Sequence, residues 1–153
     1  MKLTYTIDIN SRPDKVFYWL GTPEKAMTWM TNVSNTELVK ETPDMIGTTF
    51  RETIEENGRS TEMNGMVTQY RENRLLAFHL SGKYNTVDIE YQLKETDHTT
   101  RITVVSDIRF RSFLKPLSIV LWPVFKKKTL DQLQQEFIRL KEICEQETGN
   151  HTL

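Results

Sequence analysis

The sequence predicts an α+β fold in which a curved antiparallel sheet of about six or seven strands wraps around one long C-terminal helix, with two short helices after the first strand. Three observations support this prediction. Alternating apolar and polar segments separated by turns fill most of the chain up to residue 110. Two short helical patterns follow the first of these segments. Apolar residues then recur at spacings of three and four between residues 130 and 144, as in an amphipathic helix.

The N-terminal pattern predicts one strand and then the two short helices. Four alternating apolar residues indicate the strand: Leu3, Tyr5, Ile7 and Ile9. Ser11 is expected to cap a helix that begins near Pro13 and ends at Gly21. Pro23 repeats the start signal for a second helix, which ends near Met30.

The middle of the chain reads as a meander of hairpins. The expected strands are residues 37–40, 48–55, 61–70, 74–81, 86–95 and 101–110. Asn57 and Gly58 form a strong hairpin turn signal between the second and third of them. Several polar residues fall on the faces that should point toward the helix: Glu52, Gln69, His79, Ser81 and Ser106. A buried polar group is costly without a hydrogen bond, so such residues are candidates for orienting a ligand or a water molecule.

The final helix is expected from about Pro123 to Gln146, because proline is favoured in the first turn of a helix and disrupts its interior. Its apolar face should join the core through four residues: Leu130, Leu133, Phe137 and Leu140. Cys144, the only cysteine, continues this face and is expected to be a small packed residue rather than a nucleophile.

Length and composition limit the possible functions of the protein. A chain of 153 residues without linker or repeat predicts a single domain over residues 1–153, with an ordered core at about residues 3–147. The net charge of −1 argues against nucleic acid as the main partner. The sequence shows no signal peptide pattern and no apolar stretch that could span a bilayer, which predicts a soluble cytoplasmic protein, monomeric or homodimeric. The histidines are scattered, and we expect neither a metal site nor a cofactor.

Five short motifs in this order resemble the START/birch-pollen-allergen superfamily, also called SRPBCC or helix-grip, and within it the polyketide cyclase/dehydrase-like group. Residues 11–17 (SRPDKVF) resemble the "s.peeVf" opening of the first helix, and Trp29 stands where these proteins often have a tryptophan. Residues 46–50 (IGTTF) resemble "vGt.f". Residues 73–78 (NRLLAF) resemble "p.rlaf" with Asn73 in place of proline, and residues 99–103 (TTRIT) resemble "gtT.lt" without the glycine. The resemblance covers about residues 3–146 and implies the helix-grip fold more specifically than any activity.

The helix-grip arrangement implies a cavity between the sheet and the final helix. We expect it to open near the two short helices and the start of the final helix, where large aromatic or flexible residues gather. The predicted ligand-binding residues are Trp29, Met30, Phe50, Met63, Val67, Phe78, His79, Tyr91, Ile108, Phe113, Leu117, Leu121 and Trp122. A slip of one residue in strand register would exchange Phe78 for His79 on the wall.

The leading hypothesis is the binding of a small, largely hydrophobic molecule, such as a lipid-, polyketide- or isoprenoid-like ligand. No nucleophilic elbow, P-loop or dinucleotide motif is present, and no catalytic constellation is recognisable, so a binding protein is favoured over an enzyme. A cyclase/aromatase-type enzyme is the alternative, with four candidate residues for proton transfer: Glu52, His79, Tyr91 and Arg109. A third hypothesis is a protein-interaction module of the chaperone-activator type.

Residues 113–125 leave several interpretations open. The favoured one is that Leu117, Val120, Leu121 and Val124 pack against the sheet while the following lysines are solvated. The segment is also a candidate gate of the cavity, a contact between subunits, or a peripheral membrane contact, because Lys126, Lys127 and Lys128 adjoin its aromatic residues.

Overall fold

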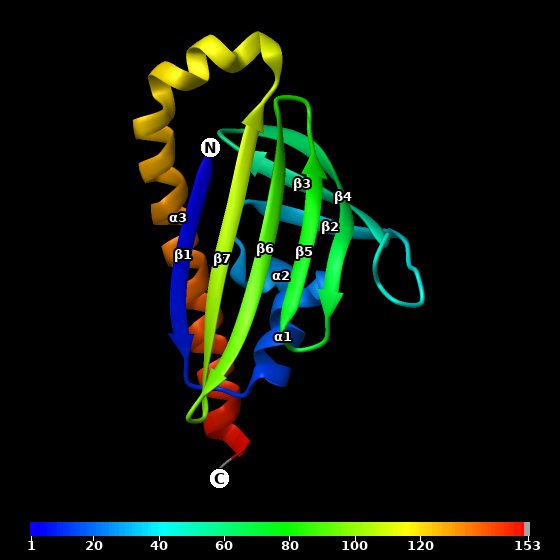
Figure 1. Cartoon of the computed structure of the whole chain (residues 1–153), viewed down its shortest axis with the longest axis vertical. Helices are drawn as coiled ribbons and strands as arrows, with labels where there is room; N and C mark the ends of the chain where they lie inside the picture. Colours follow the sequence, from blue (N-terminus) through cyan, green and yellow to red (C-terminus); the bar gives the residue numbers. More distant parts are fainter. Residues whose placement is uncertain (152–153) are drawn as a thin grey trace.

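The computed structural model describes the backbone of residues 1–151 and the side chains of residues 1–146. One antiparallel sheet of seven strands curves around a long helix, and two short helices lie on the same side of the sheet (Figure 1). The strands are β1 (Lys2–Ile9), β2 (Val33–Lys40), β3 (Thr49–Glu56), β4 (Arg59–Arg71), β5 (Leu75–Ser81), β6 (Asn85–Thr96) and β7 (Thr99–Phe110). Their spatial order is β1-β7-β6-β5-β4-β3-β2. The predicted α+β helix-grip fold is confirmed.

Tight turns set the register of the meander. Asn57 and Gly58 adopt φ angles of 53° and 74°, and Asp97 and His98 adopt 43° and 68°, so both hairpins reverse through left-handed residues, as two-residue turns require. The alternation predicted for β1, β6 and β7 therefore places one face of each strand inward. The edge strand β2 begins at Val33, before the predicted residue 37; its side chains are mostly exposed and give no alternating apolar signal.

The two short helices are α1 (Pro13–Gly21) and α2 (Pro23–Trp29), and each has proline in its first turn, as predicted. The expectation that Ser11 caps α1 was wrong. Arg12 occupies the N-cap with an extended backbone and no side-chain hydrogen bond. Ser11 is buried one residue earlier, where its carbonyl accepts a hydrogen bond of 2.7 Å from the hydroxyl of Thr100.

The final helix differs from the prediction at its start. A short 3₁₀ turn, η1 (Ser112–Leu114), leads directly into α3 (Lys115–His151), and Pro123 lies inside this helix rather than at its beginning. The ribbon of α3 changes direction in its N-terminal part (Figure 1). Proline removes one backbone donor, and a helix tolerates that loss where it bends and the freed carbonyl can reach solvent. The helix also continues past the predicted end at Gln146.

The core lies where the C-terminal part of α3 rests in the concave face of the sheet. Phe137 is fully buried, and its ring centroid lies 5.3 Å from that of Trp29 and 6.0 Å from those of Tyr5 and Tyr91. Leu140 and Cys144 are also fully buried, as predicted. The other two predicted core residues, Leu130 and Leu133, are only partly buried. The apolar stripe therefore joins the core from its middle onward.

Replacing Phe137 with alanine should lower the free energy of unfolding by about 3–5 kcal/mol, because a fully buried ring leaves a cavity among three aromatic partners. Ile138→Ala is the matched control on the next position of the same helix, where the side chain is exposed, and it should change stability by less than about 0.5 kcal/mol. Chemical denaturation monitored by circular dichroism measures both. Similar losses in the two variants would contradict the assignment of Phe137 to the core.

Candidate functional site

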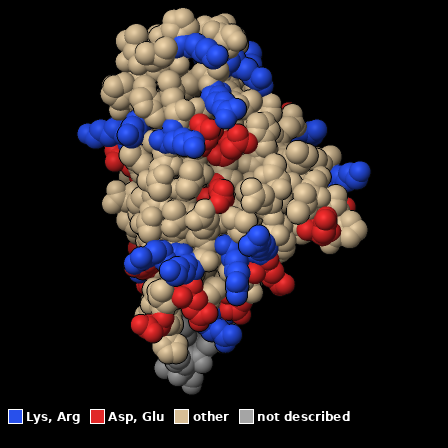
Figure 2. Space-filling view, viewed as in Figure 1, with Lys and Arg blue, Asp and Glu red and all other residues tan. Residues whose placement is uncertain are grey.

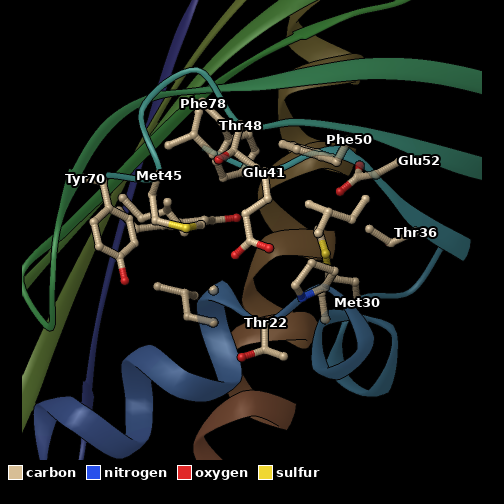
Figure 3. A pocket seen from close by; sticks show the side chains of 18 of the residues that line it. Thr22, Met30, Thr36, Glu41, Met45, Thr48, Phe50, Glu52, Tyr70 and Phe78 are labelled. Carbon is tan, nitrogen blue, oxygen red and sulfur yellow. The ribbon is translucent and has the colours of Figure 1, made fainter. Parts of the chain in front are cut away.

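A cavity of about 150 Å³ lies on the concave side of the sheet, between the strands β2 to β6 and the helices α1 and α2 (Figure 3). Gly21 at the end of α1 and Glu41 in the β2–β3 loop are both exposed and mark its open side. The lining residues are Leu20, Gly21, Thr22, Pro23, Ala26, Trp29, Met30, Thr36, Leu38, Glu41, Met45, Thr48, Phe50, Glu52, Val67, Tyr70, Leu76, Phe78 and Tyr91. This lining is mostly apolar and contains no lysine, arginine or histidine.

Aromatic rings form the wall on the side of the sheet. Phe78 packs edge-on against Phe50 with ring centroids 5.8 Å apart, and Tyr91 follows at 5.6 Å from Phe78. Gly65 makes the position of Phe50 possible, because the two residues are directly paired across β3 and β4 and a Cβ at residue 65 would stand 2.2 Å from the ring. The absence of a side chain at Gly65 therefore leaves the space in which the Phe50 ring lies.

The β2–β3 loop borders the pocket and is held in place by hydrogen bonds of its threonine hydroxyls and by backbone hydrogen bonds to β4. The N–H of Thr42 donates to the hydroxyl of Thr48 at 3.1 Å, and the hydroxyl of Thr42 donates to the carbonyl of Ile46 at 2.8 Å. The N–H of Gly47 donates to the carbonyl of Val67, whose own N–H donates to the carbonyl of Thr48, both at 2.8 Å. These two backbone hydrogen bonds to Val67 of β4 fix the loop over the sheet.

Flexible side chains stand at the opening. Figure 3 shows the carboxylate of Glu41 directed from the loop toward the helices, with Met45 beside it and Met30 on the opposite side. Methionine changes rotamer at little cost, so these two side chains can adapt to the shape of an entering molecule.

Glu52 provides the charged group at the inner end of the pocket. It is buried on β3, and within the described residues no hydrogen-bond partner contacts its carboxylate. Thr36 faces it as its direct partner on β2, and the Thr36 hydroxyl is buried without a hydrogen bond in the described part of the chain. Buried polar atoms are nearly always satisfied. The unsatisfied hydroxyl of Thr36, beside the carboxylate of Glu52 in one pocket, therefore indicates a place for a polar ligand group.

The electrostatics of this end depend on a second buried carboxylate. Glu136 on α3 accepts hydrogen bonds from the backbone and hydroxyl of Thr31, at 3.2 and 2.5 Å, and from the amide of Gln132 at 3.0 Å. Burial, together with the negative charge of Glu136, raises the pKa of Glu52 to about 7. Burial and both carboxylates also raise the pKa of the Tyr91 phenol. Glu52 can therefore gain or lose a proton near neutral pH.

Over residues 1–145 the sequence matches the family described as "Polyketide cyclase / dehydrase and lipid transport". The chain belongs to this family. No curated protein matches it in sequence.

Solved structures share the fold of this family member at low sequence identity. A START superfamily protein from Mycobacterium smegmatis superposes with a TM-score of 0.78 at 16% identity, covering 95% of this chain and 97% of that one. The Zhui aromatase/cyclase from Streptomyces sp. R1128 gives 0.75 at 12% identity, with 97% and 95% covered. Major latex-like protein 151 from Panax ginseng gives 0.70 at 14% identity, with 94% and 97% covered. These similarities establish the fold and leave the ligand open.

Six of the predicted ligand-binding residues lie in the lining of this family member's pocket: Trp29, Met30, Phe50, Val67, Phe78 and Tyr91. The register places His79 on the other face of β5, where its Nδ1 lies 2.6 Å from a carboxylate oxygen of Asp88. Arg109 is also outside the pocket, in an exposed ion pair with Asp107. Of the four candidates for proton transfer, the pocket thus brings together Glu52 and Tyr91 only.

The remaining predicted site residues lie outside the lining. Met63 and Ile108 are buried elsewhere in the core. The prediction that the pocket also uses the start of the final helix was wrong for four residues: Phe113, Leu117, Leu121 and Trp122. The reason is geometric, because α3 begins at Lys115 and its first part lies beyond the N-terminal start of β1 and the end of β7 (Figure 1), away from the cavity.

Two residues in or near the pocket, Tyr70 and Glu136, depend on features that the predicted strand alternation does not reveal. A β-bulge between Val67 and Gln69 shifts the phase of β4, so that Tyr70 faces the pocket and Gln69, predicted to point inward, is exposed. Glu136 is absent from the residues predicted for the buried face of the final helix, although it follows Leu133 by three positions and precedes Leu140 by four. That spacing is the signal that could have placed it on the buried face.

The raised pKa of Glu52 predicts a pH dependence of stability. The native state holds its proton up to about pH 7 while the unfolded chain loses it near the ordinary value of 4.5, so native stability falls as the pH rises between these values. Glu52→Gln should remove this decline, which amounts to about 3 kcal/mol between about pH 4 and pH 8. Urea unfolding of both proteins across this range measures the difference. If the free energies of unfolding of the two proteins changed with pH in parallel, the raised pKa of Glu52 would be contradicted.

Proposed function

We propose that this protein binds a small, mainly apolar molecule in the pocket between sheet and helices, and that a hydrogen-bond donor of the ligand faces Glu52. The observation that supports this best is a mostly apolar cavity whose lining includes the Glu52 carboxylate and the Thr36 hydroxyl, neither of which has a hydrogen-bond partner within the described part of the chain. An apolar body supplies affinity through burial, and one or two polar groups fix its orientation.

The size of the cavity limits the ligand. A cavity of about 150 Å³ has room for one ring of the size of benzene. A longer molecule therefore has to extend through the opening past Glu41, or displace the side chains of Met30 and Met45. The description of the family names both polyketides and lipids, and either class can place a ring or a short chain segment here.

The charge of the lining selects the polar group of the ligand. Glu41 and Glu52 are the charged lining residues, and both are acidic. A carboxylate ligand would place a third negative charge there without a cation to compensate it. An alcohol can donate to Glu52 in its ionised form, and a protonated amine can form an ion pair with it. We therefore infer preference for alcohols and amines over carboxylic acids.

Benzyl alcohol, benzylamine and benzoate form a matched set of probes for this preference. At a pH above about 7, where Glu52 is ionised, benzyl alcohol and benzylamine should perturb the NMR signals of the pocket residues Ala26 and Met30, whereas benzoate should not. Glu52→Gln should weaken the binding of benzylamine at least about tenfold, because it removes a charged hydrogen-bond acceptor, and should affect benzyl alcohol less.

The partly buried Glu90 lies on the outer face of the sheet and outside the pocket lining, so it provides the control, and Glu90→Gln should leave all three titrations unchanged. Equal binding of benzoate and benzylamine would contradict the proposed selectivity. Failure of all three probes to perturb the pocket would contradict the proposed site.

Proton transfer is a second candidate function, and the pKa of about 7 at Glu52 is the observation that favours it. A general acid–base group works best when its pKa lies near the working pH. Tyr91 lies in the same lining and keeps its proton because of its raised pKa, so it can donate a hydrogen bond to a ligand oxygen. Together the two residues could remove a proton next to a ketone and stabilise the enolate oxygen.

Exchange of the methyl protons of acetophenone with deuterated solvent, followed by NMR, tests this second function. An acid–base catalyst should accelerate the exchange, and Glu52→Gln should reduce the acceleration by about 100-fold or more. Glu90→Gln again serves as the control. Exchange at the same rate with wild-type protein, with Glu52→Gln and without protein would leave only the binding function.

A further inference from the structure

We propose that one end of the molecule, here called the tip and comprising residues 82–84 and 112–128, docks on an anionic membrane surface. The tip contains six large apolar residues that are between 49% and 74% exposed: Phe113, Leu117, Ile119, Val120, Leu121 and Val124. Tyr84 in the β5–β6 turn joins them, because its carbonyl accepts a hydrogen bond of 2.9 Å from the N–H of Arg111. Contiguous exposed apolar surface of this kind marks interaction sites.

The segment that carries the exposed apolar residues is packed against the rest of the molecule. Phe125 packs against Phe110 with ring centroids 5.3 Å apart, and Trp122 lies 5.9 Å from Phe125. These contacts attach the start of α3 to the end of β7. The opposite side of the helix then carries Leu117, Val120, Leu121 and Val124 at spacings of three and four, which forms a stripe directed to solvent. This placement corrects the expectation that these four residues pack against the sheet.

The basic residues in and next to the tip indicate an anionic partner. Residues 108–130 contain no acidic residue and six basic ones: Arg109, Arg111, Lys115, Lys126, Lys127 and Lys128. Arg109 and Lys128 form ion pairs with Asp107 and Glu56, whereas Lys115, Lys126 and Lys127 have no ion pair among the described residues. The upper end of the molecule in Figure 2 is correspondingly tan and blue, and red appears only farther down.

Positive charge beside an apolar stripe favours a lipid surface over a second copy of this chain. Two copies joined through the stripe would bring their lysines together at the same contact, where like charges repel. An anionic bilayer attracts the same lysines and accepts the apolar side chains among its acyl chains. Lysines flank the stripe at both ends, so their apolar stems can lie along it while their ammonium groups reach the head groups.

The length of the first part of α3 fits a helix that lies in the interface between membrane and water. Residues 115–128 form about 20 Å of helix at 1.5 Å per residue. No helix in the described part of the chain is both long and apolar enough to cross a bilayer. The inferred contact is therefore peripheral. It does not depend on the proposed pocket function, because the tip shares no residue with the pocket lining.

Flotation with vesicles tests the proposal. The full chain should float with vesicles of equal parts phosphatidylcholine and phosphatidylglycerol, and much less with phosphatidylcholine alone. Lys126→Glu with Lys127→Glu should weaken binding at least about 30-fold, because each basic residue near an anionic surface contributes about fivefold. Lys40→Glu with Lys94→Glu changes the net charge equally at exposed positions outside the tip, and should have a smaller effect. Equal losses in the two double variants would overturn the proposal.

The apolar contribution is tested on the same helix. Val120→Glu should reduce flotation at least about tenfold. Ile138→Glu places the same charge on an exposed apolar position of α3 outside the tip, and should leave flotation unchanged. Circular dichroism confirms that both variants are folded. Absence of binding to anionic vesicles by the wild type would overturn the proposal. So would a dimer in solution that Val120→Glu dissociates without changing flotation, since the stripe would then bind a second copy.

Discussion

The burial of Phe137 in the concave face of the sheet is the interaction on which the rest of the structure depends. Its ring contacts the rings of Tyr5, Trp29 and Tyr91, which come from the first strand, the second short helix and the sixth strand. Trp29 is itself fixed, because its indole N–H donates to the carbonyl of Trp19 at 3.0 Å. One side chain of the final helix thus connects that helix to the sheet and to α2, and both the sheet and α2 contribute residues to the pocket lining.

The pocket exists because the final helix covers only part of the concave face. Helix α3 packs beside β1, whereas the inner face of β2 to β5 is covered by the two short helices and the β2–β3 loop. Glu136 stands where these regions meet, held by three hydrogen bonds, and its charge acts on Glu52 across the boundary. The same packing that stabilises the core therefore raises the pKa of the one buried carboxyl that lines the pocket.

The two parts of α3 direct their apolar residues differently. After about residue 133 the apolar stripe faces the sheet, and the polar residues face water. Between residues 117 and 124 the apolar stripe faces water, and Trp122 with Phe125 attaches the helix to β7. A helix can reverse the direction of its apolar face in this way when its two parts meet at a bend, which the proline permits. One helix thereby contributes to the buried core in its C-terminal part and presents an exposed apolar stripe near its start.

The sequence by itself determined the order of the elements and the faces of β1, β6, β7 and the C-terminal part of α3, because these follow from local turn signals and from the periods of two and 3.6 residues. It also placed Trp29, Phe50, Phe78 and Tyr91 in the pocket lining, since large inward residues of a curved sheet surround any cavity there. Tertiary structure decided the rest. The bulge in β4 exchanged Gln69 for Tyr70, the loop brought Glu41 to the opening, and the bend of α3 carried Leu117 and Leu121 away from the sheet. Each of these outcomes depends on contacts between segments that are far apart in the sequence. Local sequence patterns do not specify such contacts.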